Sequence, residues 1–195
     1  HKVLETIENA IEPLQQLINN KYIHVHVEGN SNLKADFDED RIVQVVTNLV
    51  SNAIKFSPPQ GVVSIRLAQQ QQRALISISD QGPGIPPEAR EKVFERFHSL
   101  RPSEEDFGSH SGLGLAIGRE LITKAGGDLW VTPRTGGGAK FVVSLPRWQG
   151  LTSIDASVTY GATTDLSYNA PERANTAALQ EEERREGIKR LGGAT

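Results

Sequence analysis

The 195-residue sequence contains no cysteine and no methionine, and only 6% of its residues are aromatic. The absence of cysteine excludes disulfide bonds, thiolate zinc sites and cysteine nucleophiles. The absence of an initiator methionine indicates a fragment or a processed form. No apolar run approaches 18 residues, so no membrane-spanning segment is expected, and the first residues lack the apolar stretch of a signal peptide.

Neither sign of charge dominates, because 24 acidic residues face 21 basic residues and the net charge is −3. This balance argues against broad electrostatic capture of nucleic acid. The content of 37% hydrophobic and 23% charged residues is typical of a soluble globular protein. We therefore predict no nucleic-acid partner, no membrane contact from this segment and a cytoplasmic location. Whether a longer parent protein is anchored in a membrane is left open.

Hydrophobic periodicity predicts helices and strands in mixed order. Helices are expected over residues 2–20 (with a kink at Pro13), 40–55, 87–97 and 113–124. Asp38 is the candidate N-cap of the second helix, and Gly126-Gly127 are expected to close the last one. Strands are expected over residues 22–27, 62–68, 74–80, 128–132 and 140–145, with a five-residue turn at 69–73. This order predicts an α+β fold, a two-layer sandwich in which a mixed, mostly antiparallel sheet packs under helices.

The chain is predicted to divide at residue 146. Residues 1–146 form one domain, and residues 147–195 form a C-terminal extension. The extension combines a weakly structured segment with a charged helix inside 171–190. It has too few apolar residues to build a core of its own, so it is an appendage and not a second domain.

The strand expected at 22–27 alternates strictly, which places His24 and His26 on the face turned away from the core. A pair of histidines with this spacing can bind a metal only when more ligands lie nearby. The neighbouring sequence supplies none, so we favour a plain exposed strand face.

The helix expected at 40–55 carries two different stripes. One stripe is apolar, and the other presents Asn48, Asn52 and Lys55. Amide oxygens suit Mg²⁺, which keeps most of its waters and takes phosphate oxygens as partners, and a lysine can meet a phosphate as a point charge. The alternative is a polar flank whose asparagines only meet water.

Two glycine-rich segments follow. In the segment 80–85, Asp80 ends a strand and can accept a hydrogen bond from an exocyclic amine, while Gly82 and Gly84 let a flat ring approach the backbone. The same pattern also occurs in ordinary turns. In the segment 108–115, glycines lead into a helix, which suits a polyphosphate at the positive end of the helix dipole. This second segment is not a Walker A loop, because no Gly-Lys-Ser/Thr follows.

In this order the motifs resemble those of the catalytic and ATP-binding domain of sensor histidine kinases, in the ATPase superfamily that includes Hsp90, DNA gyrase B and MutL. Residues 48–57 resemble the N box of that family, 80–84 its first glycine box, 93–97 its F box and 112–114 its second glycine box. The resemblance covers about residues 1–146 and implies the Bergerat ATP-binding fold.

The resemblance also implies roles for single residues. Asn52 together with Asn48 holds Mg²⁺, and Lys55 contacts phosphate. Asp80 reads the adenine amine beside Gly82 and Gly84. Phe56 and Ile85 wall the base, and positive charge comes from Arg96 or Arg101. Residues 98–111 form the ATP lid, and Phe94 and Phe97 belong to the core at its hinge. The phosphates are lined by Ser111, Gly112, Leu113, Gly114 and Leu115.

The function implied is that of an enzyme, a protein-histidine kinase. The domain binds Mg·ATP and donates the γ-phosphate to a histidine on a separate dimerisation and histidine phosphotransfer domain, expected in the same polypeptide, and a response regulator receives the phosphate afterwards. Catalysis is assigned to Asn48, Asn52, Lys55 and Arg96. No histidine of this chain is followed by an acidic residue, so the acceptor histidine is expected elsewhere.

Two residues depart from the family pattern. Ala139 stands where Ser or Thr is usual, and Thr47 stands where some branches have His or an acidic residue. These departures and the missing acceptor favour an alternative, an ATP-sensing module of the same fold that transfers no phosphoryl group. A third alternative, a scaffold for the C-terminal extension, predicts no affinity for nucleotide.

Overall fold

The computed structural model of the chain describes residues 1–98 and 112–148. The extension beyond residue 148, including the helix predicted inside 171–190, lies outside the described residues. The helices are α1 (Val3–Ile11), α2 (Gln15–Lys21), α3 (Glu39–Phe56) and α4 (Gly114–Lys124). The strands are β1 (His24–Gly29), β2 (Val62–Gln70), β3 (Arg73–Ser79), β4 (Asp128–Pro133) and β5 (Ala139–Pro146).

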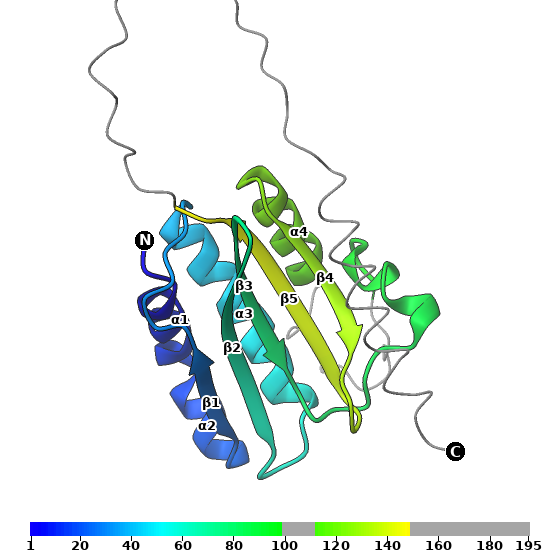
Figure 1. Ribbon diagram of the computed structural model, residues 1–195. Helices are drawn as coiled ribbons and strands as arrows, with labels where there is room; N and C mark the ends of the chain where they lie inside the picture. The colour runs from blue at the N-terminus through cyan, green and yellow to red at the C-terminus, as the bar shows by residue number, and fades with distance from the viewer. Residues whose placement is uncertain (99–111, 149–195) are drawn as a thin grey trace, which may run out of the picture. The chain divides into compact units, whose positions relative to one another are not determined.

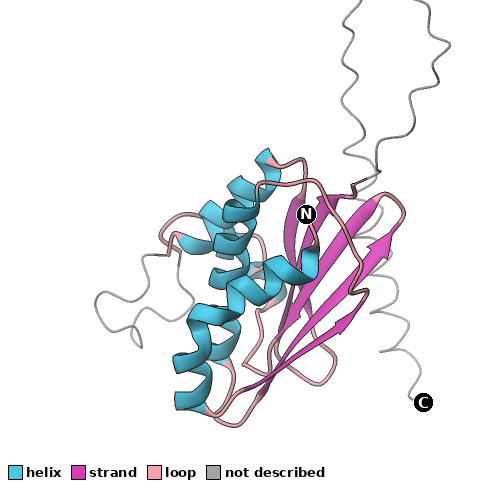
Figure 2. Ribbon diagram, turned by 90° about the vertical axis from the view of Figure 1, so that its left-hand side faces the viewer, coloured by secondary structure: helices cyan, strands magenta, loops and turns pink. Residues whose placement is uncertain are grey.

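The five strands form one sheet in the order β1-β2-β3-β5-β4. The pair β1 and β2 is parallel, and the other three neighbouring pairs are antiparallel. Figure 1 shows this sheet face on, and Figure 2 shows that the helices form a second layer on one of its faces. The predicted α+β sandwich with a mixed, mostly antiparallel sheet is confirmed.

The first helical segment breaks at Pro13, as the sequence predicts. A short 3-10 turn, Glu12–Leu14, separates α1 from α2, because proline cannot donate the hydrogen bond that would continue the helix. Helix α2 ends at Tyr22, which adopts the left-handed conformation with φ 54°. The chain then turns directly into β1.

Helix α3 is the central helix of the helical layer, with α1 and α4 as its neighbours. Asp38 caps its first turn by accepting a hydrogen bond from the backbone N–H of Arg41 at 3.2 Å. The apolar stripe faces the core and is almost fully buried; it consists of Ile42, Val45, Val46, Leu49, Val50, Ala53 and Ile54. Because one side of the helix is buried in this way, the polar stripe is left at the border between core and solvent.

Two local predictions are wrong. Strands β2 and β3 extend further than expected, so the predicted turn at 69–73 shrinks to Gln71 and Gln72, with Gln71 at φ 51°. The helix predicted at 87–97 consists of two 3-10 turns, Pro87–Ala89 and Lys92–Phe94. These turns already bury Ala89, Val93 and Phe94, and Glu95 then returns to an extended conformation.

Helix α4 ends as predicted at a pair of glycines. Gly126 adopts φ 72°, and the N–H of Gly127 reaches back to the carbonyl of Ile122 at 2.9 Å, which is the bond that closes a Schellman motif. Across residues 1–98 and 112–148, no helix combines the length and apolarity required to cross a membrane.

Candidate functional site

Asp80 is the buried acidic residue of the candidate site. It follows the last residue of β3 and is only 5% exposed. Its Oδ1 accepts hydrogen bonds from the N–H of Gly82 at 2.8 Å and from the N–H of Ala139 at 3.1 Å. Within the described chain Oδ2 accepts no hydrogen bond, so one carboxylate oxygen is fixed by the backbone and the other is available to a ligand.

Burial raises the pKa of the Asp80 carboxyl. The N–H groups of Ala139 and Gly82, and the charge of Arg134, act against this shift and favour the ionised form. A buried carboxylate that the backbone holds in one orientation is suited to reading a single hydrogen-bond donor.

Three glycines let the backbone close around Asp80. A Cβ atom at Gly82 would lie 2.7 Å from the carbonyl oxygen of Phe56, and one at Gly138 would lie 2.0 Å from the carbonyl oxygen of Asp80. Gly84 and Gly138 also adopt φ 76° and φ 92°, which favours glycine. The sequence explained Gly82 and Gly84 by the approach of a ring. In the structure, their nearest neighbours are backbone atoms of other segments.

Ser57 ties the first glycine box to the end of α3. Its side chain is buried, and its Oγ accepts a hydrogen bond from the N–H of Gln81 at 3.2 Å. The side-chain oxygen of Gln81 in turn accepts from the N–H of Val62 at 2.8 Å. Sequence reasoning did not single out Ser57, and the only available signal was its position between α3 and a pair of prolines.

The polar stripe of α3 lies where the sequence places it. Asn48, Asn52 and Lys55 are all half-buried, in contrast to the buried apolar stripe. Burial lowers the pKa of the Lys55 ammonium. Two carboxamides one helical turn apart, followed by an ammonium, form a strip that can meet a metal-bound phosphate.

Asn48 joins this strip to the second glycine box. Its Nδ2 is buried and has no hydrogen-bond partner within residues 1–98 and 112–148. A Cβ atom at Gly114, the first residue of α4, would lie 2.5 Å from Asn48 Oδ1 and 2.7 Å from Nδ2. The structure therefore brings the N box and the second glycine box into direct contact.

The second glycine box begins where the segment 98–111 ends. Gly112 adopts φ 63°, and its carbonyl accepts a hydrogen bond from the N–H of Phe97 at 3.0 Å. Leu113 is the N-cap of α4 but provides no side-chain cap, so the N–H groups of the first turn are suited to an anion. Leu115 is half-buried and packs on the core. The predicted site residues Ser111 and Arg101, and lid residues 99–111, lie outside the described residues.

Phe56 and Ile85, which are predicted to wall the base, lie on either side of Asp80 in the sequence. Phe56 is the last residue of α3 and is 48% exposed, whereas Ile85 is half-buried and packs against the core. The backbone of Phe56 contacts the first glycine box through Gly82. An exposed aromatic ring and a half-buried apolar side chain are the kinds of group that can border a flat heterocycle.

Arg96 is exposed and forms an ion pair with Glu120 on α4, with 3.3 Å between Nη2 and Oε2. The neighbouring Arg119 pairs with Glu91 at 2.8 Å, and its guanidinium carbon lies 4.7 Å from the centre of the Phe94 ring. These contacts fasten the F box to α4. In this arrangement the guanidinium of Arg96 is engaged with α4.

The two phenylalanines of the F box differ. Phe94 is 7% exposed and packs edge-on against Phe141 at 6.3 Å between ring centres, which confirms its predicted place in the core. Phe97 is 76% exposed and adopts φ 63°, so its predicted place in the core is wrong. Phe97 thus combines a left-handed backbone conformation with an exposed side chain one residue before the described range ends.

The structure gives both departures from the family pattern a local role. The hydroxyl of Thr47 donates to the carbonyl of Ala10 at 3.1 Å and so fastens α1 to α3. Ala139 is 4% exposed and holds Asp80 through its backbone N–H. Thr47 therefore joins two helices through its side chain, whereas position 139 holds Asp80 through its backbone.

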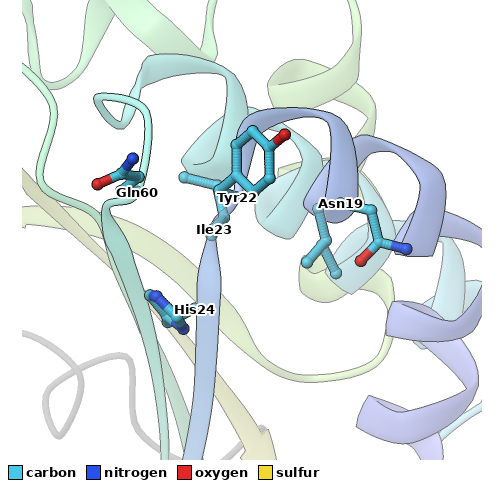
Figure 3. Close-up of a pocket in the computed structure, with 6 residues that line it drawn as sticks. Asn19, Tyr22, Ile23, His24 and Gln60 are labelled. Carbon is cyan, nitrogen blue, oxygen red and sulfur yellow. The ribbon is translucent and has the colours of Figure 1, made fainter.

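A surface depression of about 660 Å³ lies at the junction of α2, β1 and the turn before β2. Figure 3 shows Tyr22 and Ile23 at the corner between α2 and β1, with Gln60 on the adjacent turn. The depression is lined by Ile18, Asn19, Tyr22, Ile23, His24 and Gln60. None of these residues belongs to the predicted site.

The chain matches the family described as histidine kinase-, DNA gyrase B- and HSP90-like ATPases over residues 37–149. It is 44% identical over 114 residues to the sensor protein ChvG of Rhizobium meliloti (strain 1021), covering 55% of this chain and 20% of ChvG. It is 38% identical over 128 residues to the sensor histidine kinase WalK of Bacillus subtilis (strain 168), covering 62% of this chain and 21% of WalK. The chain thus spans about a fifth of the length of these relatives.

The chain is also similar to solved structures of histidine kinases. The catalytic domain of histidine kinase ThkA matches with a TM-score of 0.67 at 30% identity, covering 75% of this chain and 93% of that domain. Full-length ShkA in complex with AMPPNP matches with a TM-score of 0.63 at 28% identity, covering 75% and 30% of the two chains. ThkA in complex with the response regulator protein TrrA matches with a TM-score of 0.65 at 29% identity, covering 76% and 41%.

The chain belongs to the histidine kinase-, DNA gyrase B- and HSP90-like ATPase family. Its relatives are sensor histidine kinases, and the part that it shares with them is the ATP-binding catalytic domain.

Proposed function

We propose that this domain binds Mg·ATP and presents the γ-phosphate to a histidine on a dimerisation and phosphotransfer domain of the same, longer polypeptide. The observation that carries the proposal is the environment of Asp80, a buried carboxylate with Oδ1 fixed by two backbone N–H groups and Oδ2 without a partner in the described chain. ATP is a ligand that offers this oxygen an exocyclic amine.

At the adenine end, Asp80 accepts a hydrogen bond from the amine of the base. A hydrogen bond to a charged, buried acceptor is stronger than one between neutral groups. Phe56 and Ile85 border the ring on its two sides. The glycines at 82, 84 and 138 hold Asp80 in place through the backbone contacts described above.

At the phosphate end, Asn48 and Asn52 would hold Mg²⁺, and Lys55 would contact a phosphate. The residues present fit such an ion, because Asn48 and Asn52 place two carboxamides, whose oxygens can coordinate Mg²⁺, on one side of α3. The Nδ2 of Asn48, a buried donor without a partner among the described residues, could donate to a phosphate oxygen beside the ion. Among the described residues no three His, Asp or Glu side chains come together. This suits a hydrated ion that takes further ligands from the substrate. When bound, the ion neutralises phosphate charge.

The chain's own residues contribute position and charge to the transfer. The backbone N–H groups at the start of α4 face the phosphates, and Lys55 offsets their charge. Arg96 supplies further positive charge once its guanidinium leaves Glu120. The nucleophile is the imidazole of the acceptor domain, so this domain needs no nucleophile.

A response regulator is proposed as the next acceptor of the phosphoryl group. Support comes from ThkA, whose structure was determined in complex with the response regulator protein TrrA. The cytoplasm is the proposed location of the domain, because the proposed partners and ATP must be accessible together.

The test mixes the purified domain with the acceptor domain of the same protein and γ-³²P-labelled ATP. The expected result is a histidine-linked, acid-labile phosphate on the acceptor domain that requires Mg²⁺. Saturable ATP binding without transfer would replace the proposal with the ATP-sensing alternative. A calorimetric titration that detects no ATP binding would leave only the scaffold alternative.

A further inference from the structure

Lys21, the last residue of α2, reaches across to the C-terminus of α3. Its ammonium donates hydrogen bonds to the carbonyl oxygens of Ile54 at 3.1 Å and of Lys55 at 2.5 Å. These residues are more than 30 positions away in the sequence. Lys21 is half-buried, and this burial lowers the pKa of its ammonium.

The carbonyls that Lys21 contacts belong to the last turn of α3. The final carbonyls of a helix have no partner within the helix and carry the negative end of its dipole. A cation that donates to two of them therefore stabilises the turn by hydrogen bonds and by charge. The chain cannot continue the helix past this turn, because Ser57 is extended and Pro58 follows.

The backbone of Lys21 holds the segment that follows. Its carbonyl accepts a hydrogen bond from the N–H of Gln60 at 3.0 Å. In Figure 3, the turn with Gln60 lies beside the corner formed by Tyr22 and Ile23. Tyr22 and Gln60 both adopt positive φ values, 54° and 61°. Non-glycine residues keep this uncommon conformation only where the surrounding contacts hold them in it, and here the bond from Gln60 to Lys21 joins α2 to the turn.

Lys21 thus forms hydrogen bonds with residues on both sides of Ser57, namely Ile54 and Lys55 before it and Gln60 after it. The segment between these residues carries two residues of the proposed site. Lys55 is the proposed phosphate contact, and the carbonyl of Phe56 is in contact with Gly82 in the first glycine box. We propose that Lys21 is a positioning residue for the nucleotide site: it touches no substrate, and it sets the position of Lys55 by holding the last turn of α3. This inference rests on the proposed function.

The experiment measures ATP affinity in the presence of Mg²⁺ by calorimetry for four proteins: the wild type, Lys21→Met, Lys55→Met and the double variant. Lys21→Met is expected to weaken ATP binding about five- to tenfold, the scale of a net loss of one or two hydrogen bonds. Because Lys21 acts through Lys55, adding Lys21→Met to Lys55→Met is expected to change affinity less than twofold.

Two controls separate positioning from charge and from folding. Lys2→Met removes an equal charge from an exposed lysine that pairs with Glu5, and it should bind ATP like the wild type. Lys21→Arg keeps the charge and the donors and should restore affinity to within about threefold. If thermal unfolding shows that Lys21→Met is not folded at the assay temperature, Lys21→Gln, which keeps a shorter donor, takes its place in the cycle.

The outcomes are distinct. Equal losses from Lys21→Met in the wild-type and Lys55→Met backgrounds would overturn the inference, because a general loosening of the domain acts independently of Lys55. Wild-type affinity in Lys21→Met would overturn it as well. Failure of the wild-type protein to bind ATP would instead contradict the proposed function, before any variant is compared.

Discussion

The carboxamide of Asn48 lies directly against the backbone of Gly114, so that a Cβ atom at position 114 would lie 2.5 Å from Asn48 Oδ1 and 2.9 Å from its Cγ. Two motifs that are 66 positions apart (114 minus 48) therefore share one contact. The absence of a side chain at Gly114 decides where an amide on another helix can sit. This contact leads to the first prediction.

Gly114→Ala should displace Asn48 while leaving the domain folded. The φ of Gly114 is not positive, so alanine is not strained there, and a terminal amide can rotate away from the new methyl group. We expect Mg·ATP affinity to fall at least about tenfold, or about 1.4 kcal/mol, with a small change in the free energy of unfolding. Calorimetric titration and urea denaturation measure the two quantities.

The matched control is Gly118→Ala in the same helix, where the nearest atoms to an added Cβ lie at 3.6 Å and beyond. This is ordinary van der Waals contact, so alanine should stabilise α4 by roughly 0.5–1 kcal/mol without changing ATP affinity. Wild-type ATP affinity in Gly114→Ala would show that Asn48 has no part in binding.

Asp80→Asn should make the folded domain more stable at pH 7 and weaken its binding of ATP. Burial raises the pKa of the Asp80 carboxyl above its usual value of 3.8, so ionisation disfavours the folded state and lowers stability as pH rises through that range. The asparagine variant should therefore be more stable than the wild type at pH 7. The advantage should shrink as the pH falls toward 4.

Urea denaturation at several pH values measures this difference, and Asp36→Asn, at an exposed carboxylate, provides the control. The same Asp80→Asn variant should bind ATP more weakly by about 1–3 kcal/mol, the scale of a hydrogen bond to a charged buried group. If the difference in unfolding free energy between Asp80→Asn and the wild type did not vary with pH, burial of the ionised Asp80 carboxylate would not be its cause.

Gly138→Ala should damage the domain far more than Gly136→Ala. Both glycines have strongly positive φ values, 92° and 89°, so both substitutions strain the backbone by about 1–3 kcal/mol. Only at Gly138 does the new Cβ also collide with backbone, at 2.0 Å from the carbonyl oxygen of Asp80, whereas nothing lies within 4 Å at Gly136. Thermal unfolding of the two variants checks this, and equal melting temperatures would argue against the packing around Asp80.

Asn52→Ala should weaken the effect of Mg²⁺ and spare binding of the base. We expect adenosine affinity to stay within about twofold, since Asn52 lies on the polar stripe of α3 that is proposed to hold Mg²⁺ and not beside the proposed base site. Mg²⁺-dependent phosphoryl transfer should fall by about 1–3 kcal/mol in transition-state free energy. Titrations with ATP at zero and saturating Mg²⁺ measure how much Mg²⁺ raises ATP affinity in each variant. Asn19→Ala, which replaces an exposed asparagine on α2, is the control. An equal loss of adenosine binding in Asn52→Ala and Asp80→Asn would contradict these assignments.

The sequence predicts the features that depend on local periodicity. The two stripes of α3, the cap at Asp38, the break at Pro13 and the glycine end of α4 are all confirmed. Each depends on residues within one or two turns of one another, where side-chain spacing decides which groups meet.

Contacts between distant segments could not be predicted in this way. Lys21 and Ser57 give no periodic signal, because their partners lie in other segments that only the folded chain brings near. The prediction of a helix at 87–97 is wrong for another reason: the apolar residues fit a helix, but two 3-10 turns bury them equally well. The family resemblance places Phe97 in the core, whereas its side chain is exposed at a residue with positive φ.

The hydrogen bond between Phe97 and Gly112 has one more consequence. This bond joins Phe97, near the end of the first described range, to Gly112, the first residue of the second, with 3.0 Å between the donor nitrogen and the acceptor oxygen. When two anchor points are joined in this way, each doubling of the intervening length costs only about 0.6 kcal/mol of closure entropy. The fold should therefore tolerate an insertion between these anchors at little cost in free energy, whereas the roles proposed for Arg101 and Ser111 make nucleotide binding sensitive to the residues that stand there.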